Sequence, residues 1–140
     1  MSGSKQEWLA VARAAIEIEA AALERTAARL DGELIRAVDL ILAHPGKVVV
    51  TGIGKSGHIA RKIVATFCST GTPAVFLHPA EAVHGDLGIY TPGDPTVLIS
   101  KNGSSRELLA LVPLLRDFRS PLIGILGSTA SPPAGRLDVL

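Results

Sequence analysis

The sequence predicts an α/β fold, in which a parallel sheet lies between two layers of helices and follows a helical N-terminal segment. Short apolar runs, several of them β-branched, alternate with segments whose apolar residues recur every three or four positions. The apolar runs are continuous, which is typical of strands buried on both faces. Strands that alternate with helices form parallel sheets covered on both sides. We therefore expect a single domain over 1–140, with a helical segment at 1–45 and a three-layer α/β/α core at 46–140.

The N-terminal segment predicts two helices. The first is expected over 5 to about 30, because this stretch is rich in good helix formers and carries one apolar stripe. The residues of that stripe are Trp8, Val11, Ala15, Ile18 and Ala22. The second helix is expected over 31–43, since His44, Pro45 and Gly46 follow as a break.

The core predicts four strands and at least two helices. The strands are expected at 47–51, 74–77, 95–100 and 122–126, and the helices at 56–69 and 105–117. Residues 78–92 are expected to form a long polar connection, and a short helix is expected near Ala134. Residues 138–140 resemble the first step of a fifth strand, so we expect the core to be incomplete at its C-terminal end.

Composition excludes several classes of protein. Hydrophobic residues make up 47% of the 140 residues, and 14 basic against 13 acidic residues give a net charge of +1. That balance argues against a general nucleic-acid or membrane-surface binder, which usually has a strong basic excess. The single cysteine, Cys68, rules out an intrachain disulfide and fits a reducing compartment. Without a signal-peptide pattern or an apolar run of about 18 residues, we expect a cytoplasmic protein with no membrane or nucleic-acid partner.

The turn Gly52–Gly57 is a candidate anion site. It stands between the first core strand and the following helix, whose N-terminus offers unpaired N–H donors and a partial positive charge. Glycines allow a close backbone approach, while Lys55 adds a charge and Ser56 a hydroxyl. Ligands of parallel sheets bind beyond the carboxyl ends of the strands, where the stretch Ser100–Glu107 also follows the third strand.

Four interpretations of this turn stay open on its residues alone. Residues 54–56 match the end of a nucleotide P-loop, but Val49 stands where that motif needs its first glycine. The three glycines of the turn satisfy the dinucleotide fingerprint, but the next strand ends at His78 with no carboxylate to hold a ribose. A monophosphate or sugar-phosphate cradle needs no acidic partner. The fourth interpretation is a tight strand-to-helix turn that binds nothing.

Several stretches together carry a resemblance to a known family. They are KVVVTGIGKSGH at 47–58, STGTP at 69–73, HPAEA at 78–82, HGDLG at 84–88 and the stretch 99–108. In this order and spacing, the sequence resembles the sugar isomerase (SIS) domain of the arabinose-5-phosphate isomerase family over roughly residues 47–126.

The resemblance implies an SIS-type, flavodoxin-like fold and the interconversion of D-arabinose 5-phosphate and D-ribulose 5-phosphate. In Gram-negative bacteria this reaction supplies the sugar acid Kdo of lipopolysaccharide. Members of the family are tetramers without a required cofactor, and many carry two regulatory CBS modules after this domain. We expect a homo-oligomer that binds a sugar phosphate, truncated at its C-terminus and without CBS modules.

The resemblance also implies roles for single residues. Lys55 matches the catalytic lysine and Glu107 one of the catalytic glutamates, whereas the second glutamate and a further histidine match positions beyond residue 140. His78 matches a sugar-site histidine that can also hold inhibitory zinc. With the two loops described above, the expected substrate-binding residues are Gly54, Ser56, Gly71, Thr72, His78, His84, Ser100, Asn102, Gly103 and Ser105.

The loop after the third strand departs from the family pattern. The family has Ser-x-Ser-Gly, whereas Asn102 replaces the second serine here, and Lys101 and Arg106 add positive charge. An asparagine amide can still donate to a phosphate, with a different geometry. Ser104 and Glu107 also fit a capping box, so a structural role for Glu107 stays open.

Aldose–ketose isomerisation needs a general base near the carbon and a group that stabilises the developing oxyanion. Glu107 can serve as the base, and Lys55 or a histidine can stabilise charge or help to open the sugar ring. No metal or redox cofactor is required. An alternative is a non-catalytic SIS-type domain that binds a sugar phosphate in regulation, which the lack of the second glutamate favours and the lack of a DNA-binding segment opposes.

Overall fold

The computed structural model describes residues 4–140 and divides the chain into two compact units, with the division after Leu34. The first unit holds helix α1 (Lys5–Ala27), and the division falls inside α2 (Gly32–Ala43). The single domain with a boundary at 45 therefore stays a prediction, and the two units are described separately.

Helix α1 begins with a capping box. The Ser4 hydroxyl accepts from the Glu7 N–H at 3.3 Å, and the Glu7 carboxylate accepts from the Ser4 N–H in return. The helix ends at Ala27, slightly earlier than predicted, because the N–H groups that follow Ala28 bond three residues back rather than four. Those tighter bonds run from Arg29 to the Thr26 carbonyl at 2.9 Å and from Leu30 to the Ala27 carbonyl at 3.3 Å.

The second unit contains a four-stranded parallel sheet, as predicted. Its strands are β1 (Val48–Gly52), β2 (Ala74–Leu77), β3 (Thr96–Ser100) and β4 (Leu122–Leu126), in the order β2-β1-β3-β4. The start of a fifth strand is visible at one residue, because Val139 forms a parallel bridge with Ile123. The short 3-10 helix η2 (Ala134–Arg136) confirms the helix expected near Ala134.

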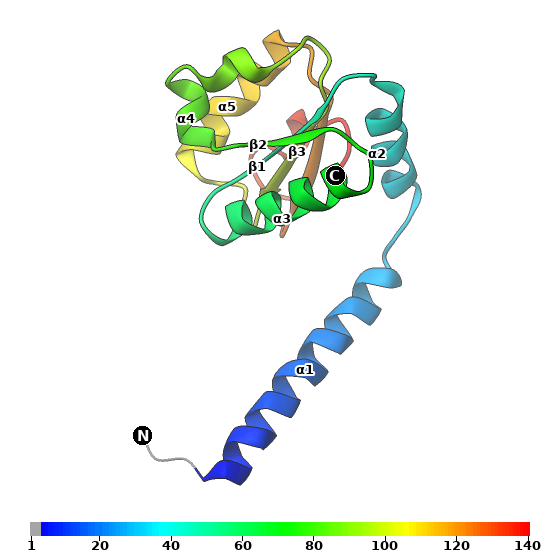
Figure 1. The fold of residues 1–140 in the computed structure, drawn as a ribbon, viewed down its shortest axis with the longest axis vertical. Coiled ribbons are helices and arrows are strands. Elements are labelled where there is room, and N and C mark those ends of the chain that lie inside the picture. The colour runs from blue at the N-terminus through cyan, green and yellow to red at the C-terminus, as the bar shows by residue number, and fades with distance from the viewer. Residues whose placement is uncertain (1–3) are drawn as a thin grey trace. The chain divides into compact units, whose positions relative to one another are not determined.

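Helices cover both faces of this sheet, so the predicted three-layer sandwich is confirmed (Figure 1). Helices α2 and α3 (Lys55–Ser69) pack on one face, and α4 (Pro79–Val83) and α5 (Arg106–Asp117) pack on the other. Successive residues of β1 serve opposite faces, since Val49 belongs to one apolar cluster and Val50 to the other. Burying a valine or leucine side chain stabilises the fold by roughly 1.5–3 kcal/mol, so these two clusters fix the sheet beneath the site.

The connection 78–92 contains helical structure that the sequence analysis missed. Helix α4 and the 3-10 helix η1 (Asp86–Ile89) replace the long loop. His78 caps α4, because its Nδ1 accepts from the Ala80 N–H at 3.3 Å, and Pro79 occupies the first helical position. Five residues are too few for an apolar period to emerge, which is why the pattern gave no sign of this helix.

A buried carboxylate ties the amino ends of two strands together. Asp94, with no exposed surface, accepts from Lys47 Nζ at 2.6 Å, from the Thr91 N–H at 2.7 Å and lies 2.9 Å from His44 Nε2. Burial by itself would raise the pKa of this carboxyl, but the hydrogen bonds from Lys47, Thr91 and His44 outweigh it and hold the pKa below its ordinary value.

No helix within residues 4–140 is both long enough and apolar enough to cross a bilayer.

Candidate functional site

The candidate site lies where the order of the sheet reverses. From β1 the chain passes to β2 on one side and then to β3 on the other, so the carboxyl ends of β1 and β3 flank the switch point. Gly52 pairs with Ile99 in the register of these strands. The turn 52–57 and the loop 100–105 therefore leave the same edge of the sheet side by side, where parallel sheets bind ligands.

The glycine turn leaves the N-terminus of α3 open. Gly54 is the N-cap residue with φ of 58°, and no side chain caps the helix. A Cβ built on Gly54 meets nothing within 4 Å. The first N–H groups of α3 have no partners within the helix, so they are available to an anion above the turn.

The other two glycines of the turn have a packing role. A Cβ on Gly57 would lie 2.8 Å from the Gly52 carbonyl oxygen, and a Cβ on Gly52 would lie 3.0 Å from the Ile99 carbonyl oxygen. Both residues are buried. Glycine is needed here because α3 approaches β1 and β3 too closely for any side chain, whether or not a ligand binds.

The loop after β3 is held in shape from two directions. The Ser100 hydroxyl accepts from the Gly103 N–H at 3.0 Å, and the Ser100 carbonyl accepts from the Gly127 N–H at 3.1 Å. Gly103 has φ of 63°, and a Cβ there would lie 2.6 Å from the Cβ of Ser131. Ser131 is buried, and its hydroxyl has no partner among the described residues. The sequence analysis missed this support, because no motif links Ser131 to the loop.

A second uncapped helix N-terminus follows the same loop. Ser105 is the N-cap of α5, and its side chain forms no capping hydrogen bond. Ser104 and Glu107 do not form the capping box that their spacing allows. Glu107 is exposed and has no hydrogen bond or ion pair with any of residues 4–140, so its carboxylate is available for chemistry.

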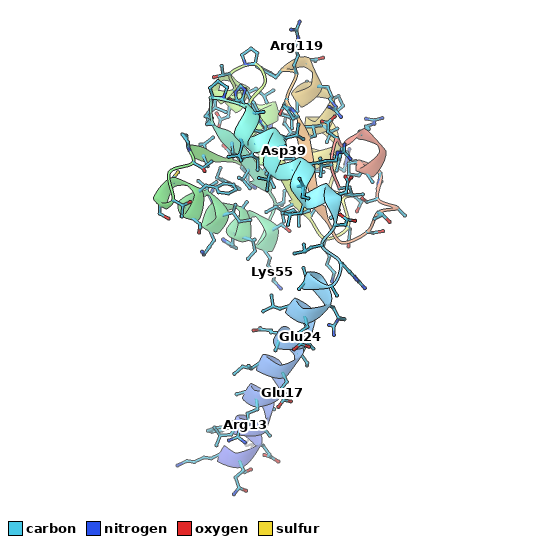
Figure 2. The ribbon with its side chains drawn as sticks, turned by 90° about the vertical axis from the view of Figure 1, so that its right-hand side faces the viewer. Arg13, Glu17, Glu24, Asp39, Lys55 and Arg119 are labelled. Atoms are coloured by element: carbon cyan, nitrogen blue, oxygen red, sulfur yellow. The ribbon has the colours of Figure 1, made fainter. Side chains whose placement is uncertain are left out.

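Several basic side chains lie near the carboxyl ends of β1 and β3 and form no ion pairs with described residues. Lys55, Lys101 and Arg106 are all exposed, and none pairs with a carboxylate in the described part of the chain. Figure 2 shows Lys55 at the start of α3, at the surface of its unit. Two open helix N-termini and three unpaired cations suit an anionic group such as a phosphate.

The predicted histidines lie beyond the end of β2. The His78 ring meets Phe76 edge-on at 6.3 Å between ring centroids, and its Nε2 is the ring nitrogen left for a ligand. It borders a hollow of about 500 Å³ lined by Arg61, Phe76, Leu77, His78, Glu81, Asp86 and Ile89. His84 is exposed at the C-terminal end of α4.

The surroundings of His78 do not suit zinc. No group of three or more His, Cys, Asp or Glu residues within 4–140 is placed to hold a metal ion. Since Nδ1 accepts the Ala80 N–H, the ring proton of neutral His78 sits on Nε2. A metal on Nε2 needs the opposite tautomer, so it would cost the hydrogen bond that caps α4.

The structure does not bring Gly71 and Thr72 to the other candidate residues. They precede β2 and therefore lie at the amino edge of the sheet, whereas Lys55 and Glu107 follow the carboxyl ends of β1 and β3. The four residues of β2 alone span about 13 Å. A single chain thus places these two residues at the far end of its own sheet.

Most of this chain matches a known protein family. The SIS domain family matches residues 41–139. The chain belongs to the SIS domain family. The resemblance seen in the sequence is thereby confirmed, and the matched region covers the whole sheet and both candidate loops.

Curated relatives of this SIS domain chain are named arabinose 5-phosphate isomerases. KdsD of Pseudomonas aeruginosa is 43% identical over 128 residues, which cover 91% of this chain and 39% of the relative. GutQ of Escherichia coli K12 is 47% identical over 120 residues, covering 86% of this chain and 37% of the relative. The chain spans about two fifths of the length of the curated relatives it matches.

Two solved structures are similar to this chain over most of its length. The E. coli CFT073 protein c3406, solved in complex with arabinose 5-phosphate, superimposes with a TM-score of 0.92 at 37% identity, covering 98% of this chain and 73% of that one. The Vibrio vulnificus NanR protein, complexed with ManNAc-6P, gives a TM-score of 0.79 over 91% of this chain and 48% of its own. Its 18% identity shows the shared fold alone.

Proposed function

We propose that this SIS domain serves an aldose–ketose isomerase that interconverts D-arabinose 5-phosphate and D-ribulose 5-phosphate. One observation carries the proposal: the open N-terminus of α3 at Gly54 and Lys55 follows the switch point, next to the loop that leads to Glu107, whose carboxylate has no partner among the described residues. The kinship with arabinose 5-phosphate isomerases supports the choice of sugar. Because the chain spans about two fifths of those relatives, the activity of the whole enzyme is part of the proposal.

The phosphate of the substrate would occupy the edge between the turn and the loop. The orphan N–H groups of α3 and the Ser56 hydroxyl donate to its oxygens, and Lys55 neutralises charge. Asn102 donates through its amide in place of the serine of the family, and Lys101 adds charge beside it. Ser100, Gly103 and Ser105 shape this loop and present its backbone.

The isomerisation would move one proton between C2 and C1 of the open-chain sugar. The Glu107 carboxylate takes the proton from C2 of the aldose, which leaves an enediolate with its negative charge on O1. The hydroxyl proton then passes from O2 to O1, and the Glu107 carboxyl returns its proton to C1 as O2 becomes the carbonyl oxygen of the ketose. The Lys55 ammonium stabilises the oxyanion that develops on the carbonyl oxygen. His78 Nε2–H and His84 bind sugar hydroxyl groups. The proposed reaction uses no cofactor, and the hydrogen bond by which His78 caps α4 opposes a zinc ion at that ring.

Gly71 and Thr72 would contact substrate only in the site of another copy. They lie at the amino edge of their own sheet, so one chain cannot bring them to its own Lys55. This placement supports a homo-oligomer, with the tetramer as our proposal. The proposal extends to a cytoplasmic enzyme of Kdo and lipopolysaccharide synthesis that has no nucleic-acid or membrane partner.

An assay of the purified chain with arabinose 5-phosphate tests the function. We expect weak turnover to ribulose 5-phosphate, abolished in Lys55→Ala and lowered by about 10²–10⁴-fold in Glu107→Gln, because a general base contributes in that range. Lys62→Ala is the matched control, since Lys62 lies on the same helix and bonds to Thr66. Turnover that survives both Lys55→Ala and Glu107→Gln would contradict the proposed roles.

Binding without turnover is the second candidate function. It would make the chain a non-catalytic, regulatory SIS domain, and it is favoured by the open N-terminus of α3, which can bind a phosphate without the help of a catalytic base. The same assay separates the two, because a regulatory domain would bind the sugar phosphate at the glycine turn and leave it unchanged.

A further inference from the structure

A hollow of about 650 Å³ lies at the amino edge of the sheet, away from the candidate site. Its lining residues come from α2, from the end of α5 and from the segment that leads into β4, and all belong to the second unit. The candidate site instead follows the carboxyl ends of β1 and β3, and five residues of strand such as β4 span about 16 Å. Figure 2 shows Lys55 at one end of this unit and Arg119, which lines the hollow, at the other. A ligand in the hollow would therefore leave the switch point free.

Arg119 holds a backbone conformation that normally calls for glycine. Its φ is 56°, and no other residue with a side chain within 4–140 has a positive φ. Helix α5 ends there in a Schellman motif, because the Ser120 N–H donates to the Leu115 carbonyl at 3.1 Å and the Arg119 N–H donates to the Arg116 carbonyl at 2.9 Å. Glycine usually occupies this position, since a side chain in the left-handed region is strained. An arginine here costs stability, and strain of this kind is typical of functional positions.

Guanidinium groups outnumber carboxylates in this hollow. Arg36, Arg116 and Arg119 line it together with Asp39 and Asp138. Asp138 is already neutralised, because both of its carboxylate oxygens accept from Arg116 Nη1, at 2.8 and 3.1 Å. Arg36 Nη2 donates to the Asp138 backbone carbonyl at 2.7 Å, which holds that guanidinium in place without cancelling its charge. Arg119 is exposed and has no hydrogen bond or ion pair with any of residues 4–140. The hollow therefore has a positive balance of charge.

The same hollow also has an apolar part. Leu40 and Ala43 contribute to it from α2, and Pro121 contributes from the segment before β4. Sites for small molecules combine apolar lining with a few charged or polar groups and measure roughly 300–1,000 Å³. A volume of about 650 Å³ lies within that range. The lining thus suits a ligand that has one anionic group and an apolar body.

We propose that this hollow binds a small organic anion, a phosphate ester or carboxylate with a ring or a short hydrocarbon body. Arg119 and Arg36 hold the anionic group, and the apolar body covers Leu40 and Pro121. An inorganic anion would leave that apolar surface in water. A cation would meet three guanidinium groups on its way to Asp39. This inference is independent of the proposed isomerase activity, because the two sites lie at opposite edges of the sheet.

Titration of the isotope-labelled full chain with phenyl phosphate, followed by amide chemical shifts, locates the ligand. Phenyl phosphate joins an anionic group to an apolar ring, whereas inorganic phosphate and phenol each offer only one of the two. We expect saturable shifts within 36–43 and 116–120 with phenyl phosphate, and much smaller shifts there with either control at the same concentration. Shifts at 54–57 and 101–107 report the glycine turn and its neighbouring loop and are fitted separately. No shifts within 36–43 and 116–120, or an equal response to inorganic phosphate, would overturn the proposal.

Arg119→Gly should change stability and binding in opposite directions. We expect its thermal midpoint to rise by a few degrees, because glycine relieves the strain of the Schellman position. Its affinity for phenyl phosphate should fall on the order of tenfold, because a charge-assisted hydrogen bond is lost. Arg136→Ala is the matched control, since it removes the same charge from an exposed arginine that does not line the hollow. Unchanged affinity in Arg119→Gly, or an equal loss in Arg136→Ala, would contradict the role of Arg119.

Asp39→Asn tests the sign of the ligand's charge. Asp39 is exposed, lines the hollow and has no hydrogen bond or ion pair among the described residues, so its carboxylate repels an anion there. The amide keeps the size of the side chain and removes the charge. We expect Asp39→Asn to bind phenyl phosphate severalfold more tightly than the wild type, measured by the same amide shifts. Weaker binding by Asp39→Asn would show that the hollow selects a cationic group and would overturn the proposal.

Discussion

At the scale of single residues, the site depends on a few side chains that are left without partners. Lys55 and Glu107 are exposed and unpaired among the described residues, and they stand at the two loops that flank the switch point. The sequence predicted both through the family resemblance. The role of Ser131 could not be predicted, because Ser131 follows a different strand and only the fold brings it next to Gly103.

Asp94 should contribute to stability, because it is the most completely buried charge among the described residues. Asp94→Asn should lower the free energy of unfolding by about 3 kcal/mol, since it leaves Lys47 without its charged partner. Chemical denaturation at pH 7 measures this loss. Asp117→Asn at the exposed C-terminal end of α5 is the matched control and should change little.

Asp94 should also make the stability of the fold depend on pH. The folded pKa of Asp94 lies below its unfolded value of about 3.9. Its contribution is therefore complete above about pH 4 and is lost as the pH falls further, through the folded pKa. The difference in stability between wild type and Asp94→Asn should shrink over that range, and a difference that stays constant down to about pH 2 would contradict the assignment.

At the scale of elements, the sequence predicted every strand because each is a continuous apolar run between clear breaks. Helix α4 was missed, since Pro79 after His78 marks a helix start but five residues show no period. The early end of α1 was missed as well, because Ala28 and Leu30 are good helix formers whose tighter turn has no sequence signal.

Two glycines of one turn are required for different physical reasons. Gly57→Ala should cost about 1–3 kcal/mol of stability, because its Cβ would lie 2.8 Å from the Gly52 carbonyl oxygen. Gly54→Ala has open space around its Cβ but should also cost about 1–3 kcal/mol, because its φ of 58° and ψ of −125° form a backbone conformation that residues with a side chain rarely adopt. Thermal unfolding measures both losses, and a Gly57→Ala variant as stable as the wild type would show that the close approach does not require glycine.

At the scale of the whole molecule, strand order decides which distant segments meet. The alternation of strands and helices predicted a parallel sheet, and the rule for carboxyl ends predicted that the turn at 52 and the loop at 100 share an edge. The same rule puts Gly71 and Thr72 at the opposite edge, because they precede their strand.

The position of the bound sugar phosphate is the most direct test of the proposed site. Titration of the isotope-labelled chain with arabinose 5-phosphate, followed by amide chemical shifts, locates the ligand on the sheet. We predict that the largest shifts fall within 54–57 and 101–107, at the switch point between β1 and β3. Largest shifts elsewhere on the chain, or none at these residues, would contradict the central claim.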